Sequence, residues 1–140
     1  MLAVTILCVG TLKEQYLRDA VAEYEKRLSG SCRFRIREVK NEMLIPSLPP
    51  RAYKIALCVE GIQLSSEELA KKIGELPVRG ISEIVFVIGD SDGLAEEVKA
   101  ACDFRLSFSK MTFPHQLMRV ILCEQIYRAI NILGGGKYHK

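Results

Sequence analysis

The chain has 140 residues, of which 49% are hydrophobic and 26% charged, with ten glycines and five prolines. Such usage is typical of an ordinary globular protein and excludes disordered, collagen-like and coiled-coil chains; no apolar run approaches the ~18 residues that a membrane span needs. The formal net charge of +3 excludes no class of partner by itself, and the length predicts one domain, residues 1–140, that buries its core without a disulfide or a metal.

The first third of the chain alternates an apolar run with helical periodicity. The continuous apolar run at residues 2–9 predicts a central strand. Residues 14–28 carry apolar side chains at the spacing of an amphipathic helix. Residues 33–39 alternate charged and apolar side chains, which predicts a half-exposed strand with three arginines on one face. These arginines are Arg33, Arg35 and Arg37.

The same alternation continues after a proline-rich loop expected at residues 41–52. Further strands are expected at 54–59, 84–88 and 104–108. Further helices are expected at 65–76, 94–101 and 116–133, the first of them opened by the capping-box pattern Ser65-Ser-Glu-Glu68. Strands that alternate with helices predict an α/β domain of three layers around a mostly parallel sheet.

The helix expected at residues 116–133 is apolar around most of its circumference. Only Arg119, Glu124, Arg128 and Asn131 interrupt the apolar surface. A domain of this size can cover one face of such a helix with its own sheet, but hardly all of it. We therefore predict a homodimer that packs through this helix.

The cysteines and the charges indicate the surroundings of the protein. Five cysteines are scattered without a Cys-x-x-Cys pair, which predicts a reduced, cytoplasmic protein with neither a disulfide framework nor a zinc site. Residues 1–104 carry 14 Lys+Arg against 16 Asp+Glu, whereas residues 105–140 carry six against one, a net charge of +5. The basic end indicates either an anionic partner or a solvated helix face and tail.

The turn Gly89-Asp-Ser-Asp-Gly93 lies between an apolar strand and a helix. In open α/β sheets, ligands bind at the carboxyl ends of the strands, where this turn is expected. Its pattern is neither that of a dinucleotide-binding turn nor that of a P-loop. Asp90 and Asp92 either hold Mg²⁺ or, as we favour, bond to their own backbone in a tight turn.

The segment Ser107-Phe-Ser-Lys-Met-Thr-Phe-Pro-His115 combines aromatic side chains, hydroxyls and a Pro-His step. Its phenylalanines either pack inward or line a pocket, because full exposure of both would be costly. Pro114 suits the first turn of a helix. A capping or packing role is favoured over catalysis for His115. From the residues alone, the prediction is thus an α/β dimer with a site at the strand ends.

Several blocks together resemble one enzyme family. The most specific is Leu106-Ser-Phe-Ser-Lys-Met-Thr-Phe-Pro-His-Gln-Leu-Met-Arg119, followed by Glu124-Gln-Ile-Tyr-Arg-Ala129 and the terminal Tyr138-His-Lys140. Shorter blocks upstream include Val4-Thr-Ile-Leu-Cys-Val-Gly10 and Val85-Phe-Val-Ile-Gly89. These blocks are similar to those of the RlmH-type methyltransferases of the SPOUT superfamily, and the similarity covers nearly the whole chain apart from residues 41–52.

The resemblance implies a fold, an activity and a cofactor. The family has an α/β fold with a C-terminal trefoil knot, is homodimeric, and methylates N3 of a pseudouridine in 23S (large-subunit) ribosomal RNA with S-adenosyl-L-methionine. By this resemblance, the expected partner is the ribosome, as the assembled particle, and no metal is involved. The positions that match the cofactor-binding segments are Leu57, Gly89, Phe108, Ser109, Lys110, Met111, Thr112 and Phe113.

The resemblance also gives roles to the C-terminal residues. It places the tail near the partner subunit's cofactor, with Tyr138 or His139 assisting removal of the N3 proton. Arg119 and Lys140, with Lys110, are expected to contact RNA phosphate. The alternative function is a degenerate member that binds RNA or cofactor without turnover.

Three departures from the family pattern bear on that alternative. Asp90 occupies a position where the family usually has a second glycine, which is costly if the backbone there needs a positive φ. Asp90 could instead place a carboxylate beside the positive end of the cofactor. The segment Gly134-Gly-Gly-Lys137 replaces an Arg-Gly-x-Pro pattern, and the connection at 41–52 is shorter than usual by about one helix.

Overall fold

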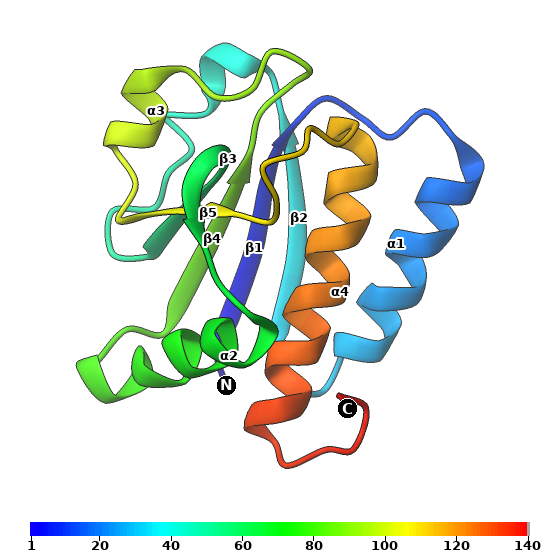
Figure 1. Cartoon of the computed structure of the whole chain (residues 1–140), viewed down its shortest axis with the longest axis vertical. Coiled ribbons are helices and arrows are strands. Elements are labelled where there is room, and N and C mark those ends of the chain that lie inside the picture. The colour runs from blue at the N-terminus through cyan, green and yellow to red at the C-terminus, as the bar shows by residue number, and fades with distance from the viewer. Residues whose placement is uncertain (140) are drawn as a thin grey trace.

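The apolar runs of the sequence form one parallel sheet. The computed structural model of the protein describes residues 1–139, and in this range the sheet has five strands in the order β2-β1-β4-β3-β5, all paired in parallel (Figure 1). The strands are β1 (Ala3–Val9), β2 (Arg33–Val39), β3 (Tyr53–Gln63), β4 (Glu83–Ile88) and β5 (Phe104–Ser107). Because they are parallel, their carboxyl ends share one edge of the sheet.

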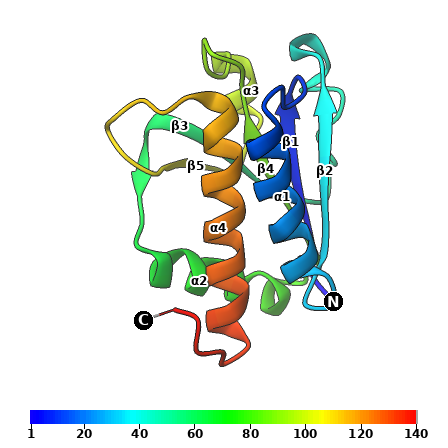
Figure 2. The same ribbon diagram turned by 90° about the vertical axis from the view of Figure 1, so that its right-hand side faces the viewer.

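Helices cover the two faces of the sheet unequally. The helices are α1 (Gln15–Leu28), α2 (Ser66–Glu75), α3 (Glu96–Ala100) and α4 (His115–Leu133), with 3-10 turns at Asn41–Met43 and Pro77–Arg79. Helices α1, α2 and α4 pack on one face, whereas the short α3 and the segment after β2 lie on the other (Figures 1 and 2). The predicted α/β class and parallel sheet are confirmed, with one thick and one thin helical layer.

The core divides along the same faces. The larger cluster joins the α1–α2–α4 side of the sheet and includes Phe86, Leu122 and Ile126, all completely buried. The smaller cluster on the other side is closed by Leu44, which is also completely buried and comes from the short connection after β2. A connection expected to be a plain loop therefore supplies a core residue.

Local signals of the sequence set the helix boundaries. The Ser65 hydroxyl accepts a hydrogen bond from the Glu68 backbone N–H at 3.0 Å, and the Glu68 carboxylate accepts one from the Ser65 N–H at 2.8 Å, so the predicted capping box is confirmed. Helix α3 is shorter than expected, because the chain before Glu96 is still extended at Ala95. Within residues 1–139, no helix is long and apolar enough to span a membrane.

Helix α4 packs only part of its apolar surface against its own domain. Its buried face comprises Arg119, Leu122, Cys123, Ile126 and Ala129. Leu117 and Leu133 remain 38% and 46% exposed. The partly uncovered surface matches the prediction that one domain cannot enclose this helix, and the homodimer remains a prediction.

Candidate functional site

A cavity of about 790 Å³ lies at the carboxyl edge of the sheet. Its walls come from the middle of β3, the end of β4 and the turn after it, α3, the segment after β5 and the start of α4. The volume is in the range of sites for small molecules and cofactors. The position is that expected for a ligand site in an open parallel sheet.

This cavity gathers nearly all the residues predicted to bind the cofactor. Those that line it are Leu57, Gly89, Phe108, Ser109, Met111, Thr112 and Phe113. Lys110 lies in the same segment, is exposed and is not part of the wall. Segments separated by up to half the chain are thus brought to one place.

An irregularity in β3 shapes one wall. Leu106 of β5 is opposite both Leu57 and Ile62 of β3, so the intervening residues bulge out of the regular ladder. Cys58 and Glu60 in this bulge line the cavity. Gly61 makes the bulge feasible, because a Cβ there would lie 2.7 Å from the backbone carbon of Leu106. Only Gly61 hinted at the bulge in the sequence, and we had not predicted these wall residues.

The turn after β4 forms a second wall and explains Asp90. The backbone φ of Asp90 is not positive, since no described residue other than glycine has a positive φ. The backbone strain that a non-glycine residue would suffer at a positive φ therefore does not arise at Asp90. The Asp90 carboxylate accepts a hydrogen bond from the Asp92 N–H at 2.9 Å. This bond is the one that the tight-turn interpretation predicts, and residues 1–139 contain no cluster of three or more candidate metal ligands.

Glycine is required at position 89 because the backbone of the turn lies too close for a side chain, and not because of a positive φ. A Cβ at this position would lie 2.5 Å from the carbonyl carbon of Gly93 and 2.9 Å from the backbone nitrogen of Leu94. Such distances force the turn to move. A side chain at Gly89 is therefore incompatible with this shape of the cavity.

We expect Gly89→Ala to weaken cofactor binding at least tenfold, because the turn that lines the cavity must be displaced. The matched control is Gly74→Ala in α2, where a Cβ meets only the end of the Leu133 side chain. Calorimetric titration with S-adenosyl-L-methionine, the cofactor that the resemblance implies, measures both variants. Unchanged affinity in Gly89→Ala would show that this turn does not contact the ligand.

The segment after β5 is ordered by its own hydroxyls. The Ser107 hydroxyl donates to the Ser109 carbonyl at 2.9 Å, and the Ser109 hydroxyl accepts from the Met111 N–H at 3.0 Å. Phe108 packs against the main core and also lines the cavity, so both roles considered for the phenylalanines are met by this residue. Met111 is 74% exposed at the mouth of the cavity.

Charged side chains also lie in the wall of the cavity. Glu60 forms an ion pair with Lys99 of α3, and both line the cavity with Asp90 and Asp92. The hydrogen bond from Lys99 lowers the pKa of Glu60, so this carboxylate is ionised at neutral pH. His115, the first residue of α4, is also in the wall. Carboxylates in the wall of a cavity favour a ligand with a positive centre.

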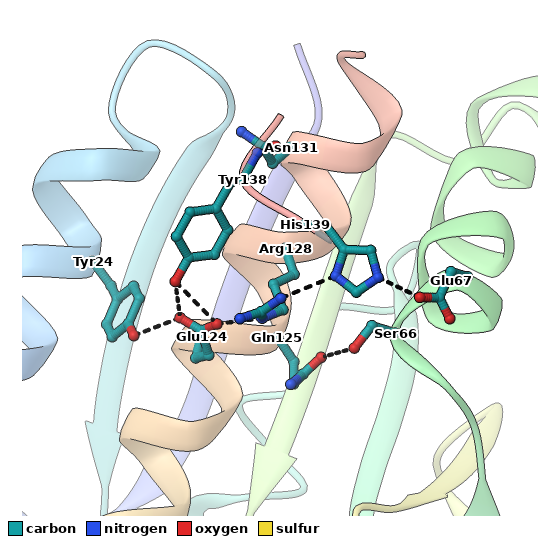
Figure 3. A network of polar contacts seen from close by, with 9 residues as sticks. All are labelled: Tyr24, Ser66, Glu67, Glu124, Gln125, Arg128, Asn131, Tyr138 and His139. Carbon is teal, nitrogen blue, oxygen red and sulfur yellow. Dashed lines mark hydrogen bonds and ion pairs between the residues drawn. The ribbon is translucent and has the colours of Figure 1, made fainter. Parts of the chain in front are cut away.

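The C-terminal tail lies elsewhere. After α4 the chain turns back along the helix, and neither Tyr138 nor His139 lines the cavity of its own chain (Figures 1 and 3). The Tyr138 hydroxyl donates to Glu124 at 3.0 Å, and the Tyr138 N–H donates to the Asn131 side chain at 3.1 Å. The tyrosine ring also packs edge-on against Tyr127 at 4.7 Å between centroids.

The His139 ring is held between two charged side chains (Figure 3). Arg128 contacts Nδ1 at 3.0 Å, and Glu67 of α2 contacts Nε2. Arginine can only donate, so Nδ1 accepts and Nε2 carries the proton given to Glu67. In this docked position neither ring nitrogen is free to take a proton. The docked tail is therefore not in a position to act as a base.

Glu124 is the acceptor at the centre of this network. Burial raises the pKa of Glu124, but hydrogen bonds from Tyr24, Arg128 and Tyr138 outweigh burial and leave the pKa below its ordinary value. The lowered pKa means that the carboxylate contributes to stability at neutral pH and loses this contribution only in acid. The pKa of Tyr24 is raised, mainly by burial and next by the neighbouring Glu124 carboxylate. The Tyr24 hydroxyl therefore stays protonated and donates its hydrogen bond to Glu124.

The predicted contact of Arg119 with RNA phosphate is wrong for this structure. The side chain is only 2% exposed; it donates to Glu38 at 2.6 Å and to the Gly10 carbonyl at 3.0 Å. Arg119 thus ties α4 to the ends of β1 and β2, inside the protein. Lys140, the other residue predicted to contact phosphate, lies outside the described residues.

Comparison with known proteins gives a consistent picture. Residues 2–139 match the family model described as "Predicted SPOUT methyltransferase". The ribosomal RNA large subunit methyltransferase H of Clostridium novyi is 48% identical over 157 aligned positions, which cover 98% of this chain and 99% of that protein. The protein of the same name from Bifidobacterium adolescentis is 46% identical over the same shares of both chains.

Solved structures agree on the fold at low sequence identity. A probable methylase family protein from Haemophilus influenzae has a TM-score of 0.61 at 13% identity, covering 98% of this chain and 70% of its own. A methyltransferase from Legionella pneumophila, solved with bound S-adenosylmethionine, has a TM-score of 0.51 at 8% identity, covering 94% and 66%.

Proposed function

The chain belongs to the SPOUT methyltransferase family, and on this premise we propose that it methylates large-subunit ribosomal RNA with S-adenosyl-L-methionine. The observation that carries the proposal is the single cavity formed by the three matched segments, at Leu57, Gly89 and Phe108–Phe113. Its support is the 44–48% identity to full-length relatives named ribosomal RNA large subunit methyltransferase H. The finer target, N3 of a pseudouridine in 23S rRNA, rests on the resemblance of the sequence blocks.

The cavity fits this cofactor by size and by chemistry. Apolar side chains such as Leu57, Phe108 and Phe113 can enclose the adenine and the methionine chain, while nearby backbone groups offer hydrogen bonds. Lys99 neutralises Glu60. The carboxylates of Asp90 and Asp92, which have no ion pair within residues 1–139, are therefore those that favour a positive sulfonium. When bound, the cofactor supplies an activated methyl group for transfer to a ring nitrogen.

The protein's own residues contribute mainly by positioning. The rigid turns at Gly89 and Ser107–Met111 hold one side of the cavity in place, so that a nucleotide base can be aligned with the methyl group. The base must lose its N3 proton, and we assign this step to Tyr138 or His139. Both residues lie outside the cavity of their own chain, so the proposed active site needs the tail of a second subunit.

A homodimer that packs through α4 would meet this need. The apolar surface of α4 that its own domain leaves exposed, including Leu117 and Leu133, is the surface we assign to the contact. We also assign to this chain the C-terminal knot of the family and a cytoplasmic location with the ribosome. The tail has to leave Glu67 and Arg128 before His139 can accept a proton.

The deciding experiment is transfer of a labelled methyl group to ribosomes from cells that lack this modification, followed by mapping of the product. We expect one modified pseudouridine in the large-subunit RNA. Free rRNA, isolated subunits and whole ribosomes are compared as substrates, and the assembled particle is expected to be best. Cofactor binding without transfer to any of the three would indicate a degenerate member and contradict the proposal.

A further inference from the structure

We propose that Arg33, Arg35 and Arg37 of β2 form a second contact site for RNA, which binds the phosphate backbone away from the catalytic cavity; this inference rests on the RNA-directed function proposed above. The three residues are defined here as the arginine row. No cavity residue belongs to it, and the catalytic proposal does not use it.

The arginine row lies on a free edge of the sheet. β2 is the last strand on its side, paired only with β1 (Figure 2). Phe34 and Ile36, at the intervening positions, pack against the core under α1 and α4. Since neighbouring side chains of a strand point to opposite faces, the arginines project from the other face, at a repeat of about 6.6 Å.

Their guanidinium groups have weak partners. Arg33 and Arg37 each donate to one backbone carbonyl, both at 3.4 Å. Arg35 donates to the Thr5 hydroxyl at 3.3 Å and lies 3.9 Å from the carboxylate of Glu83, with 62% of its side chain exposed. The guanidinium carries five N–H donors, so most donors of the row are not used within the described chain.

Several other arginines of the protein, though not all, are paired with carboxylates at short range. Arg27 pairs with Glu23 at 2.8 Å, and Arg105 pairs with Glu96 at 2.8 Å. The contrast shows that the chain does not neutralise the row as it does these arginines. Three like charges at neighbouring positions of one edge repel one another, so their side chains gain most from an anion that spans them.

Phosphate groups of RNA fit this arrangement. Successive phosphates of one strand present negative charges at a comparable repeat, and guanidinium binds phosphate through two parallel hydrogen bonds. The carboxyl end of β2 also reaches the end of the sheet where the cavity opens, and only β1 lies between β2 and β4, a separation of about 10 Å. An RNA strand along the row would therefore lead toward the catalytic cavity.

Arg33 and Arg35 are exposed and Arg37 is half-buried, and the proposed dimer does not cover the row. It is on the face opposite α4, the helix assigned to the subunit contact. A purely structural role is the alternative, because Thr5 beneath Arg35 is only 3% exposed and long arginine stems can cover a sheet face. The structural role depends on the aliphatic part of the arginine side chains, whereas RNA binding depends on their charge. An experiment that removes only the charge therefore distinguishes the two roles.

The test replaces all three arginines by glutamine, which keeps most of the stem and removes the charge. The control replaces three exposed cations on α1, on α2 and at the 3-10 turn that follows it, Lys26, Lys71 and Arg79, by glutamine, so that the change in net charge is equal. Binding to ribosomes that lack the modification is measured at several salt concentrations, together with KM, kcat and titration with S-adenosyl-L-methionine.

We expect the arginine-row variant to bind ribosomes at least tenfold more weakly, with a higher KM, while kcat and cofactor affinity stay unchanged. Its salt dependence should be shallower by about 0.7–0.9 in the log–log slope for each phosphate that the variant no longer neutralises. Equal weakening in the control, or an unchanged slope, would overturn the proposal. If the wild-type protein binds ribosomes through the row but transfers no methyl group, the function proposed above fails and the arginine row stands.

Discussion

Removal of residues 138–140 is expected to lower the rate of methyl transfer to the ribosome at least 100-fold and to leave cofactor binding unchanged. The rate should fall because the truncated protein lacks both candidates for proton removal, and a positioned base contributes about 10²–10⁴ in rate. Cofactor affinity should persist because the walls of the cavity come from segments of one chain that the truncation leaves intact, and the tail of the second subunit is assigned to the nucleotide base and not to the cofactor. Single-turnover transfer of labelled methyl groups and calorimetric titration measure the two effects separately.

Point variants divide the loss between the two side chains. Tyr138→Phe removes the hydroxyl that donates to Glu124 but keeps the ring that packs on Tyr127. His139→Gln keeps a polar side chain but removes the titratable ring. Deletion of Lys140 alone measures the part of the loss that comes from its expected contact with RNA phosphate. Full methylation by the protein without residues 138–140 would contradict a catalytic tail, whatever the position of the tail in the dimer.

The location of the tail is also where sequence reasoning stopped. The blocks that end in Tyr138-His-Lys140 pointed to catalytic residues, but they gave no sign that His139 would dock between Arg128 and Glu67. Glu67 is 72 residues from His139 in sequence, and this contact depends on how α4 and α2 pack. A local pattern cannot encode such a contact.

The strands and helices themselves were predictable because their signals are local. The apolar runs became β1 and β4, and the Ser65–Glu68 pattern became a capping box with both of its hydrogen bonds. The segment expected at 54–59 extends as β3 to Gln63, because the chain re-enters the ladder after the bulge at Cys58–Gly61. The bulge depends on the partner strand β5, which periodicity in β3 does not report.

Most of the candidate cavity could be named beforehand because the segment Phe108–Phe113 is distinctive in its composition. The resemblance then joined it to Leu57 and Gly89, and the structure brings these positions together. Glu60 and Lys99 could not be foreseen, since their ion pair joins the bulge of β3 to α3. The carboxylate in the wall is therefore a product of the fold and not of a motif.

Arg119 illustrates the opposite error, in which charge was taken as a sign of exposure. It interrupts an apolar helix, and a cation in the basic C-terminal quarter of the chain was expected to contact RNA. The structure instead places it 2% exposed, where Glu38 and the Gly10 carbonyl accept its hydrogen bonds. The ends of β1 and β2 supply these acceptors, and this arrangement is visible only in the tertiary structure.

Arg119→Leu is accordingly expected to lower the free energy of unfolding by about 2–4 kcal/mol, because it leaves a carbonyl without its donor and Glu38 without its cation. The lower part of this range is favoured, since the Glu38 side chain is 38% exposed and water can solvate it. Urea denaturation measures the change. Arg27→Leu, which breaks an exposed pair with Glu23, is the matched control and should alter stability little.

The same pair of variants decides between the two roles of Arg119. A structural role predicts loss of stability with an unchanged salt dependence of ribosome binding in whatever protein remains folded. A phosphate contact predicts normal stability and a shallower salt dependence. An Arg119→Leu protein as stable as the wild type would therefore contradict a stabilising role for the tie between α4 and the ends of β1 and β2.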